Sequence, residues 1–168
     1  MKPLLIVDGY NVIGAWSEAE RRQWPLDECR DRLMRQLEDY GGYSGEEVVL
    51  VFDGYQSDRK FRTEETHGAL TLVFTKHGET ADSYIERLVA LTPKYRAVRV
   101  ATSDGLEQSQ VLSTGATRLT SRELLRELKQ LRTVGMEAHR HQSLGRKDSL
   151  AARLPEDTRE MLEKLRRG

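Results

Sequence analysis

Short apolar segments that recur between stretches of helical periodicity place the strongest constraint on the fold of this chain. The segments are continuously apolar rather than alternating, which is typical of strands covered on both faces. Five segments have this character: Leu4–Val7, Val48–Phe52, Leu70–Phe74, Ala97–Ala101 and the weaker Ala116–Leu119. Strands that alternate with helices form a parallel sheet between two helical layers. The sequence therefore predicts an α/β fold, a three-layer α/β/α sandwich with a central, mainly parallel sheet.

Apolar residues at helical spacing lie between and after these segments. The predicted helices cover residues 26–40, 80–91, 106–112, 120–134 and 156–167. Thr120 and Glu123 have the spacing of a capping box, which marks the start of the fourth helix. Residues 135–154 show no clear period, so we expect a mobile or partly helical connection there. We therefore expect one domain over residues 1–134 and a basic extension over 135–168, within the same domain or appended to it.

Length and composition suit one domain with a substantial core. The 168 residues are 38% hydrophobic and 32% charged, and the single cysteine, Cys29, excludes a disulfide framework and fits a reducing cytosol. No apolar run approaches the roughly 18 residues needed to span a bilayer. The first eight residues turn acidic too soon for a signal peptide. We expect a cytoplasmic protein with no membrane partner.

The formal net charge of zero hides an uneven distribution of charge. Residues 1–121 are net negative, whereas residues 122–168 are net positive. An acidic site with a basic flank suits a polyanion whose chemistry needs cations. Amphipathic helices with solvated charged faces give the same distribution, and charge alone does not separate the two interpretations.

Carboxylates follow the predicted strands at one end. Asp8 and Asp53 come directly after the first two strands, and Asp104 follows the fourth. Asp82 lies in the first turn of the helix after the third strand. Because ligands bind outside the carboxyl ends of parallel strands, these four side chains can converge on one pocket. Each also has a structural explanation, since Asp-Gly pairs are common in turns and an aspartate favours a helix N-terminus.

Four neighbouring carboxylates stay ionised at low cost only beside cations. Carboxylate oxygens with water are the ligands that Mg²⁺ or Mn²⁺ prefers, and such ions support phosphodiester hydrolysis without a histidine base. The sequence therefore predicts a metal site for phosphodiester chemistry at this edge of the sheet. Asn11 is placed to orient Asp8 or to bind the scissile phosphate, and a helix cap is the alternative.

Two groups of basic residues are candidates for RNA contacts. The candidates are Arg59, Lys60 and Arg62 in a loop after the second strand, Arg122, Arg126 and Lys129 on one face of the fourth helix, and the hydroxyl of Ser103. Such groups contact phosphates, and Phe61 or Tyr55 could stack on a base. The cations of the helix are also spaced to pair with Glu123 and Glu127, which would make them structural.

Several short motifs occur in order along the chain. They are Asp8-Gly9-Tyr10-Asn11, Val51-Phe52-Asp53-Gly54, Thr75-Lys76 with Glu79-Thr80-Ala81-Asp82, Thr102-Ser103-Asp104, and Ser121-Arg122-Glu123-Leu124-Leu125. Each motif is weak by itself. As an ordered set they resemble the YacP-like NYN domain family, a branch of the PIN-like nuclease superfold, over about residues 1–131.

The resemblance implies a PIN-like fold and a Mg²⁺- or Mn²⁺-dependent endoribonuclease that acts on mRNA in association with the ribosome. By motif position, Asp8, Asp53, Asp82 and Asp104 would hold the metal and activate water, Asn11 would position the site, and Glu79 would lie behind the ligands. No DNA partner is expected. Two alternatives remain open. One is a non-catalytic RNA- or ribosome-binding adaptor on the same fold, and the other is a phosphotransfer domain of a different fold, which lacks support from a Gly-rich loop.

Overall fold

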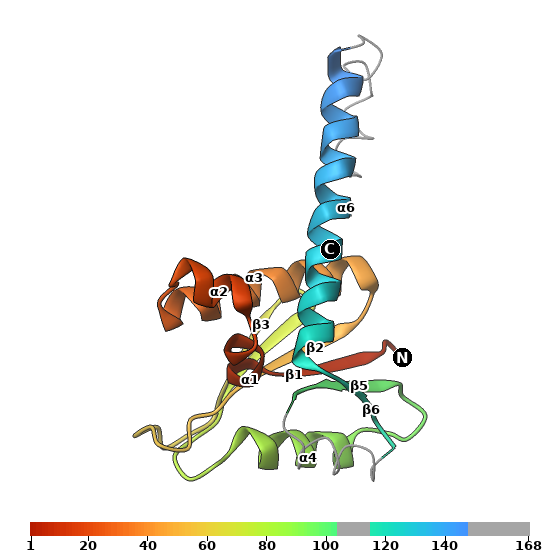
Figure 1. Ribbon diagram of the computed structural model, residues 1–168. Coiled ribbons are helices and arrows are strands. Elements are labelled where there is room, and N and C mark those ends of the chain that lie inside the picture. The colour runs from red at the N-terminus through yellow and green to blue at the C-terminus, as the bar shows by residue number, and fades with distance from the viewer. Residues whose placement is uncertain (104–114, 148–168) are drawn as a thin grey trace.

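A computed structural model describes residues 1–103 and 115–147, with side chains described as far as Val134. Within these residues, six strands form one sheet in the order β3-β4-β2-β1-β5-β6. The strands are β1 (Leu4–Asp8), β2 (Glu47–Phe52), β3 (Thr63–His67), β4 (Leu70–Phe74), β5 (Val98–Ala101) and β6 (Thr117–Leu119). All neighbouring strands pair in parallel except β3 and β4. The predicted α/β fold with a mainly parallel sheet is confirmed (Figure 1).

Helices cover both faces of this sheet. The described helices are α1 (Gly9–Gly14), α2 (Ser17–Arg22), α3 (Leu26–Ser44), α4 (Ala81–Leu91) and α6 (Ser121–Lys147). Helix α4 lies on one face, whereas α1, α2, α3 and the first turns of α6 lie on the other (Figure 1). The result is the expected three-layer arrangement.

The central strand β1 shows why the apolar segments are continuous. Its side chains alternate between two cores, with Leu5 and Val7 facing the layer of α3, and Leu4 and Ile6 facing α4. All four are 2% exposed or less. Burial of each such side chain contributes roughly 1.5–3 kcal/mol, so a polar residue on either face would be costly.

Three short elements were not predicted from the sequence. Strand β3, Thr63–His67, has no apolar residue and pairs only with β4, so it forms an exposed antiparallel edge. Charged side chains on such an edge oppose pairing with other molecules. Helices α1 and α2 have six residues each, which is too short for a helical period to stand out.

Helix α6 is longer than the sequence indicates. Its start is as predicted, because the Thr120 hydroxyl oxygen accepts a hydrogen bond from the Glu123 amide at 3.1 Å. It continues through Gly135 and Gly145 to Lys147 rather than ending near Val134, since each glycine costs a helix only about 1 kcal/mol. Its C-terminal part projects away from the sheet (Figure 1). The predicted helices 106–112 and 156–167 lie outside the described residues.

A polar cluster ties α6 to the body of the domain. Arg99 of β5 donates hydrogen bonds to Glu46, to the Tyr40 hydroxyl and to Glu127 of α6, at 2.8, 2.6 and 3.2 Å. Burial raises the pKa of Tyr40, so its hydroxyl keeps its proton and lies 2.9 Å from Glu127 Oε2. Glu127 therefore faces the sheet and not the neighbouring cations of its own helix. None of the helices in the described ranges is long and apolar enough to cross a bilayer.

Candidate active site at the carboxyl edge of the sheet

The carboxyl ends of β2, β1 and β5 lie side by side. Asp8, the last residue of β1, is in register with Val51 of β2, and Val7 is in register with Ala101 of β5. Asp53 directly follows β2, so it lies at the same edge as Asp8. The fourth predicted ligand, Asp104, falls outside the described residues.

Asp53 is bound by two backbone amides. Its Oδ1 accepts from Tyr55 N–H at 2.7 Å, and its Oδ2 accepts from Ala81 N–H at 3.1 Å. Ala81 is the first residue of α4, and Asp82 is the second. Asp53 therefore fixes the start of the helix that carries Asp82. Each Asp53 oxygen still has a lone pair, so metal binding by this carboxylate is compatible with the two bonds.

A buried threonine supports this turn from behind. The Thr75 hydroxyl accepts from Gly54 N–H at 2.6 Å and donates to the Glu79 carbonyl at 2.8 Å, and the side chain is fully buried. A Cβ on Gly54 would collide with the Thr75 carbonyl oxygen, and the φ of Gly54 is not positive. The glycine of this Asp-Gly pair thus permits two backbones to approach, and no left-handed turn requires it.

Glu79 is bonded through its carbonyl to Thr75, and its predicted place behind the metal ligands stays a prediction. Its side chain is 4% exposed, and it forms an ion pair with both nitrogens of the Arg62 fork and a longer one of 3.7 Å with Arg87. The Arg62 hydrogen bonds hold the pKa of Glu79 below its ordinary value. The Arg62 guanidinium also lies 4.6 Å from the centre of the Tyr84 ring. These contacts give Arg62 a structural role, and the RNA contact predicted for it stays a prediction.

Asn11 joins three segments that are distant in the sequence. Its Oδ1 accepts from the Ser103 amide at 2.8 Å and from the Ser121 hydroxyl at 2.7 Å. Its own amide donates to Asp8 Oδ1 at 3.5 Å, so Asp8 caps α1. The Asn11 side chain therefore connects α1 to the loop after β5 and to the start of α6. The Ser103 hydroxyl oxygen accepts from the Ser121 amide at 3.1 Å, so Ser103 also belongs to this junction.

An open cavity of about 410 Å³ adjoins Asp53. Tyr10 and Tyr55 are among its lining residues, and Tyr55 is 48% exposed. Its volume is within the range of small-ligand pockets. Of the predicted RNA contacts in the following loop, Arg59 and Lys60 are exposed, and the Arg59 guanidinium lies 4.6 Å from the centre of the Phe74 ring.

The donors at this edge have the chemistry of a hard divalent cation. Asp8 and Asp82 are partly exposed, and Asp82 has no hydrogen-bond or ion-pair partner among the described residues. Among the described side chains of residues 1–103 and 115–134, no group of three from His, Cys, Asp and Glu could hold a metal ion. Mg²⁺ commonly binds through only one or two carboxylates and keeps several waters, so the carboxylates of Asp8 and Asp82 have the donor chemistry that such an ion needs.

Thr75 and Tyr10 lie at this site although their sequence motifs do not mark them as site residues. Thr75 is the first residue after β4, at the same edge as the acids, so its place after a buried strand was the available signal. Tyr10 lies between Asp8 and Asn11, and its ring packs on Phe52 with centroids 4.9 Å apart. The sequence pattern offers no signal for its place beside the cavity.

The layers and the mainly parallel sheet are those of a PIN-like NYN fold. The family model described as the YacP-like NYN domain matches residues 5–167. This chain belongs to that family. The match continues beyond residue 134, so it includes most of the residues expected to form the extension.

Known relatives agree with this assignment. The protein YacP of Bacillus subtilis (strain 168) is 35% identical over 167 residues, which cover 98% of this chain and 97% of that protein. The crystal structure of Rae1 (YacP) from Bacillus subtilis matches with a TM-score of 0.66 and 35% identity, over 100% of this chain and 96% of that chain. The crystal structure of a point mutant of Rae1 matches with a TM-score of 0.67 and 37% identity, over 83% of this chain and 80% of that chain.

Proposed function

We propose that this chain is a Mg²⁺- or Mn²⁺-dependent endoribonuclease that hydrolyses phosphodiester bonds of mRNA on the translating ribosome. The observation that carries the catalytic part is the gathering of Asp8, Asp53 and the first turn of α4 at one edge of the sheet. Membership of the family adds a nuclease-type domain. The ribosomal part rests on the family resemblance, and the cytoplasmic location follows from it.

The residues at the edge have distinct tasks in this proposal. Asp8 and Asp82 hold the divalent ion, together with water and with Asp104. When bound, the ion polarises the phosphate and neutralises charge on the leaving oxygen. Asp53 sets the position of Asp82 through the Ala81 amide. Asn11 keeps the loop after β5 against α1, and Arg59 and Lys60 contact phosphates beside the cavity.

Cleavage of RNA by the purified chain tests the catalytic part. Asp82→Asn is expected to lower the rate with Mg²⁺ or Mn²⁺ at least about a hundredfold, because a metal site supplies several kcal/mol of transition-state stabilisation. Glu86→Gln is the matched control, since Glu86 is exposed on the same helix one turn later. Products should carry 5′-phosphates, and a chelator should stop the reaction. Unchanged cleavage by both Asp8→Asn and Asp82→Asn would refute the site.

The ribosomal part needs its own comparison. The same mRNA is supplied free and on translating ribosomes, and we expect faster cleavage on the ribosome. Equal rates would remove the ribosome from the proposal and leave the nuclease. RNA binding without cleavage of either substrate would instead establish the non-catalytic adaptor.

A further inference from the structure

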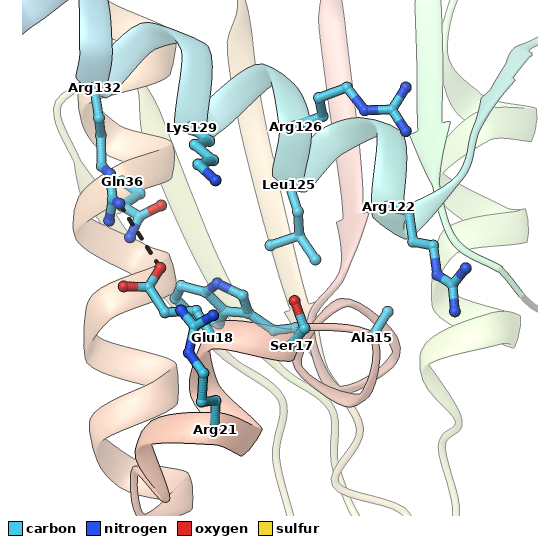
Figure 2. A pocket seen from close by; sticks show the side chains of 11 residues that line it. Ala15, Ser17, Glu18, Arg21, Gln36, Arg122, Leu125, Arg126, Lys129 and Arg132 are labelled. Carbon is cyan, nitrogen blue, oxygen red and sulfur yellow. Dashed lines mark ion pairs between the residues drawn. The ribbon is translucent and has the colours of Figure 1, made fainter.

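A second hollow, the basic pocket, lies between α6 and the α1–α2 segment. Its volume is about 430 Å³. Five cations and one carboxylate contribute to its lining: Arg21, Arg122, Arg126, Lys129, Arg132 and Glu18. Figure 2 shows Lys129 and Arg132 pointing from α6 toward the helix that carries Glu18 and Arg21. The pocket therefore has an excess of positive charge on two facing elements.

As far as side chains are described in α6, up to Val134, its acids form no ion pair with these cations. Glu123 accepts a hydrogen bond from the Thr120 hydroxyl at 3.0 Å, and Glu127 is bound by Arg99 and Tyr40. The alternative interpretation of the sequence, i,i+4 pairing of Arg122, Arg126 and Lys129 with Glu123 and Glu127, is therefore not observed within the described residues.

Among the described residues that line the pocket, Glu18 is the only carboxylate, and it forms ion pairs with two arginines. Its oxygens lie 3.7 Å from Arg132 Nη2 and 3.4 Å from Arg22 Nε. Within the part of the chain that the structure describes, Arg21 and Lys129 form no ion pair. Like charges held together without counterions favour the binding of an anion.

The basic pocket begins beside the acidic edge. Ser121, the residue before Arg122, donates to Asn11, whose amide in turn contacts Asp8. From Arg122 to Arg132 the helix rises about 15 Å, with a cation at every third or fourth residue on one side. A row of this length that starts at the candidate active site suits a polymer better than a small anion.

The apolar floor of the pocket argues against base recognition. Trp16 lines the pocket but is 6% exposed, and its ring packs edge-on against Trp24 with centroids 5.3 Å apart. No indole face is thus presented for stacking. Contacts in this pocket would be to phosphates, which carry no sequence information.

We propose that the basic pocket binds phosphates of the single-stranded RNA that flanks the scissile bond on one side. The inference rests on the proposed function, because it places the reacting phosphate at the acidic edge beyond Ser121. The pocket would bind the RNA backbone independently of sequence. The affinity for RNA would then depend on the length of the strand on that side and on the salt concentration.

Fluorescence anisotropy with a labelled 16-nucleotide oligouridylate tests the pocket, in EDTA so that binding is measured without cleavage. The double variant R126Q/K129Q is expected to bind at least about tenfold more weakly at 0.1 M salt. The slope of log affinity against log salt should fall by about 0.7 for each lost phosphate contact. The control K94Q/R118Q removes the same charge from exposed residues outside the pocket and should stay within twofold.

A variant that removes a negative charge from the pocket should strengthen binding, and a folding defect would not produce this effect. Glu18→Gln should strengthen binding about threefold, since it frees Arg132 and removes the carboxylate from the pocket lining. Equal losses of RNA affinity in R126Q/K129Q and in the control would refute RNA binding in the basic pocket. Weaker binding by Glu18→Gln would refute it as well. Uridine monophosphate competing as well as the 16-mer would show a small-anion site and would also overturn it.

The two proposals fail separately. Wild-type cleavage that is lost in Asp82→Asn, together with unchanged binding by R126Q/K129Q, would leave the nuclease and remove the flanking-strand grip. Specific loss of binding in R126Q/K129Q without any cleavage by the wild type would instead show a phosphate-binding pocket on a non-catalytic adaptor, and the role in holding a substrate would be refuted.

Discussion

Removal of the Thr75 hydroxyl should weaken the whole acidic edge. Thr75→Val keeps the shape of the side chain but leaves the buried Gly54 N–H without an acceptor and the Glu79 carbonyl without a donor. Because Thr75 is fully buried, water does not replace these bonds. A buried polar group without its partner costs about 1–3 kcal/mol, so we expect a loss of about 3 kcal/mol in the free energy of unfolding.

Thr75→Ser is the matched control. It keeps the hydroxyl and removes one methyl group, and we expect a loss of about 1 kcal/mol. Urea unfolding can be followed by the fluorescence of Trp16 and Trp24, which pack against each other in the core. With a slope of about 2 kcal/mol per molar urea, the midpoint should fall by about 1.5 M in Thr75→Val and about 0.5 M in Thr75→Ser.

Thr75→Val should be less stable than Thr75→Ser if the hydroxyl contributes more than the methyl group. Thr75→Val as stable as Thr75→Ser, or more stable, would show that the two hydrogen bonds of the hydroxyl contribute less than its methyl group. The slope must stay constant, because a changed slope would indicate a different unfolded state or an intermediate.

Two ion-pair predictions concern the groups behind the edge. Arg62→Met should cost about 3 kcal/mol, because it leaves the buried Glu79 carboxylate with only the longer ion pair of 3.7 Å to Arg87, and Glu79→Gln should cost less. Arg62 holds the pKa of Glu79 in the folded protein below its ordinary value of 4.5. The stabilisation by this ion pair is therefore present above about pH 4.5 and is lost as the pH falls through the pKa of Glu79 in the folded protein. The urea midpoints of Arg62→Met and of the wild type should accordingly converge in acid. Arg99→Met should also cost about 3 kcal/mol, because it removes the ion-pair partner of the mostly buried Glu46 carboxylate. Adding Glu46→Gln to this variant should recover part of the lost stability in the same urea assay. If no stability is recovered, the buried charge of Glu46 is not the cause of the loss.

Local sequence predicted the parallel strands because each is short, apolar and covered on both faces. The end of such a strand is visible in the sequence, so the place of Asp8 and Asp53 at one edge followed directly. Strand β3 was not predicted because an exposed edge needs no apolar residues, and its pairing with β4 depends on tertiary context. The sequence predicted only a mobile or partly helical connection after Val134, because no clear period continues there, although a glycine weakens a helix without ending it.

The division of tasks among the acidic residues depends on contacts that no local pattern contains. Asp53 and Asp82 look alike in the sequence, since each is an aspartate beside a strand end or a helix start. The structure separates them, because both oxygens of Asp53 are bound by backbone amides while Asp82 has no partner among the described residues. The bond from Ala81 to Asp53 spans 28 positions and makes one carboxylate the support of the other. Loss of Asp53 should therefore disturb the chain even without metal, whereas loss of Asp82 should be felt only in the chemistry.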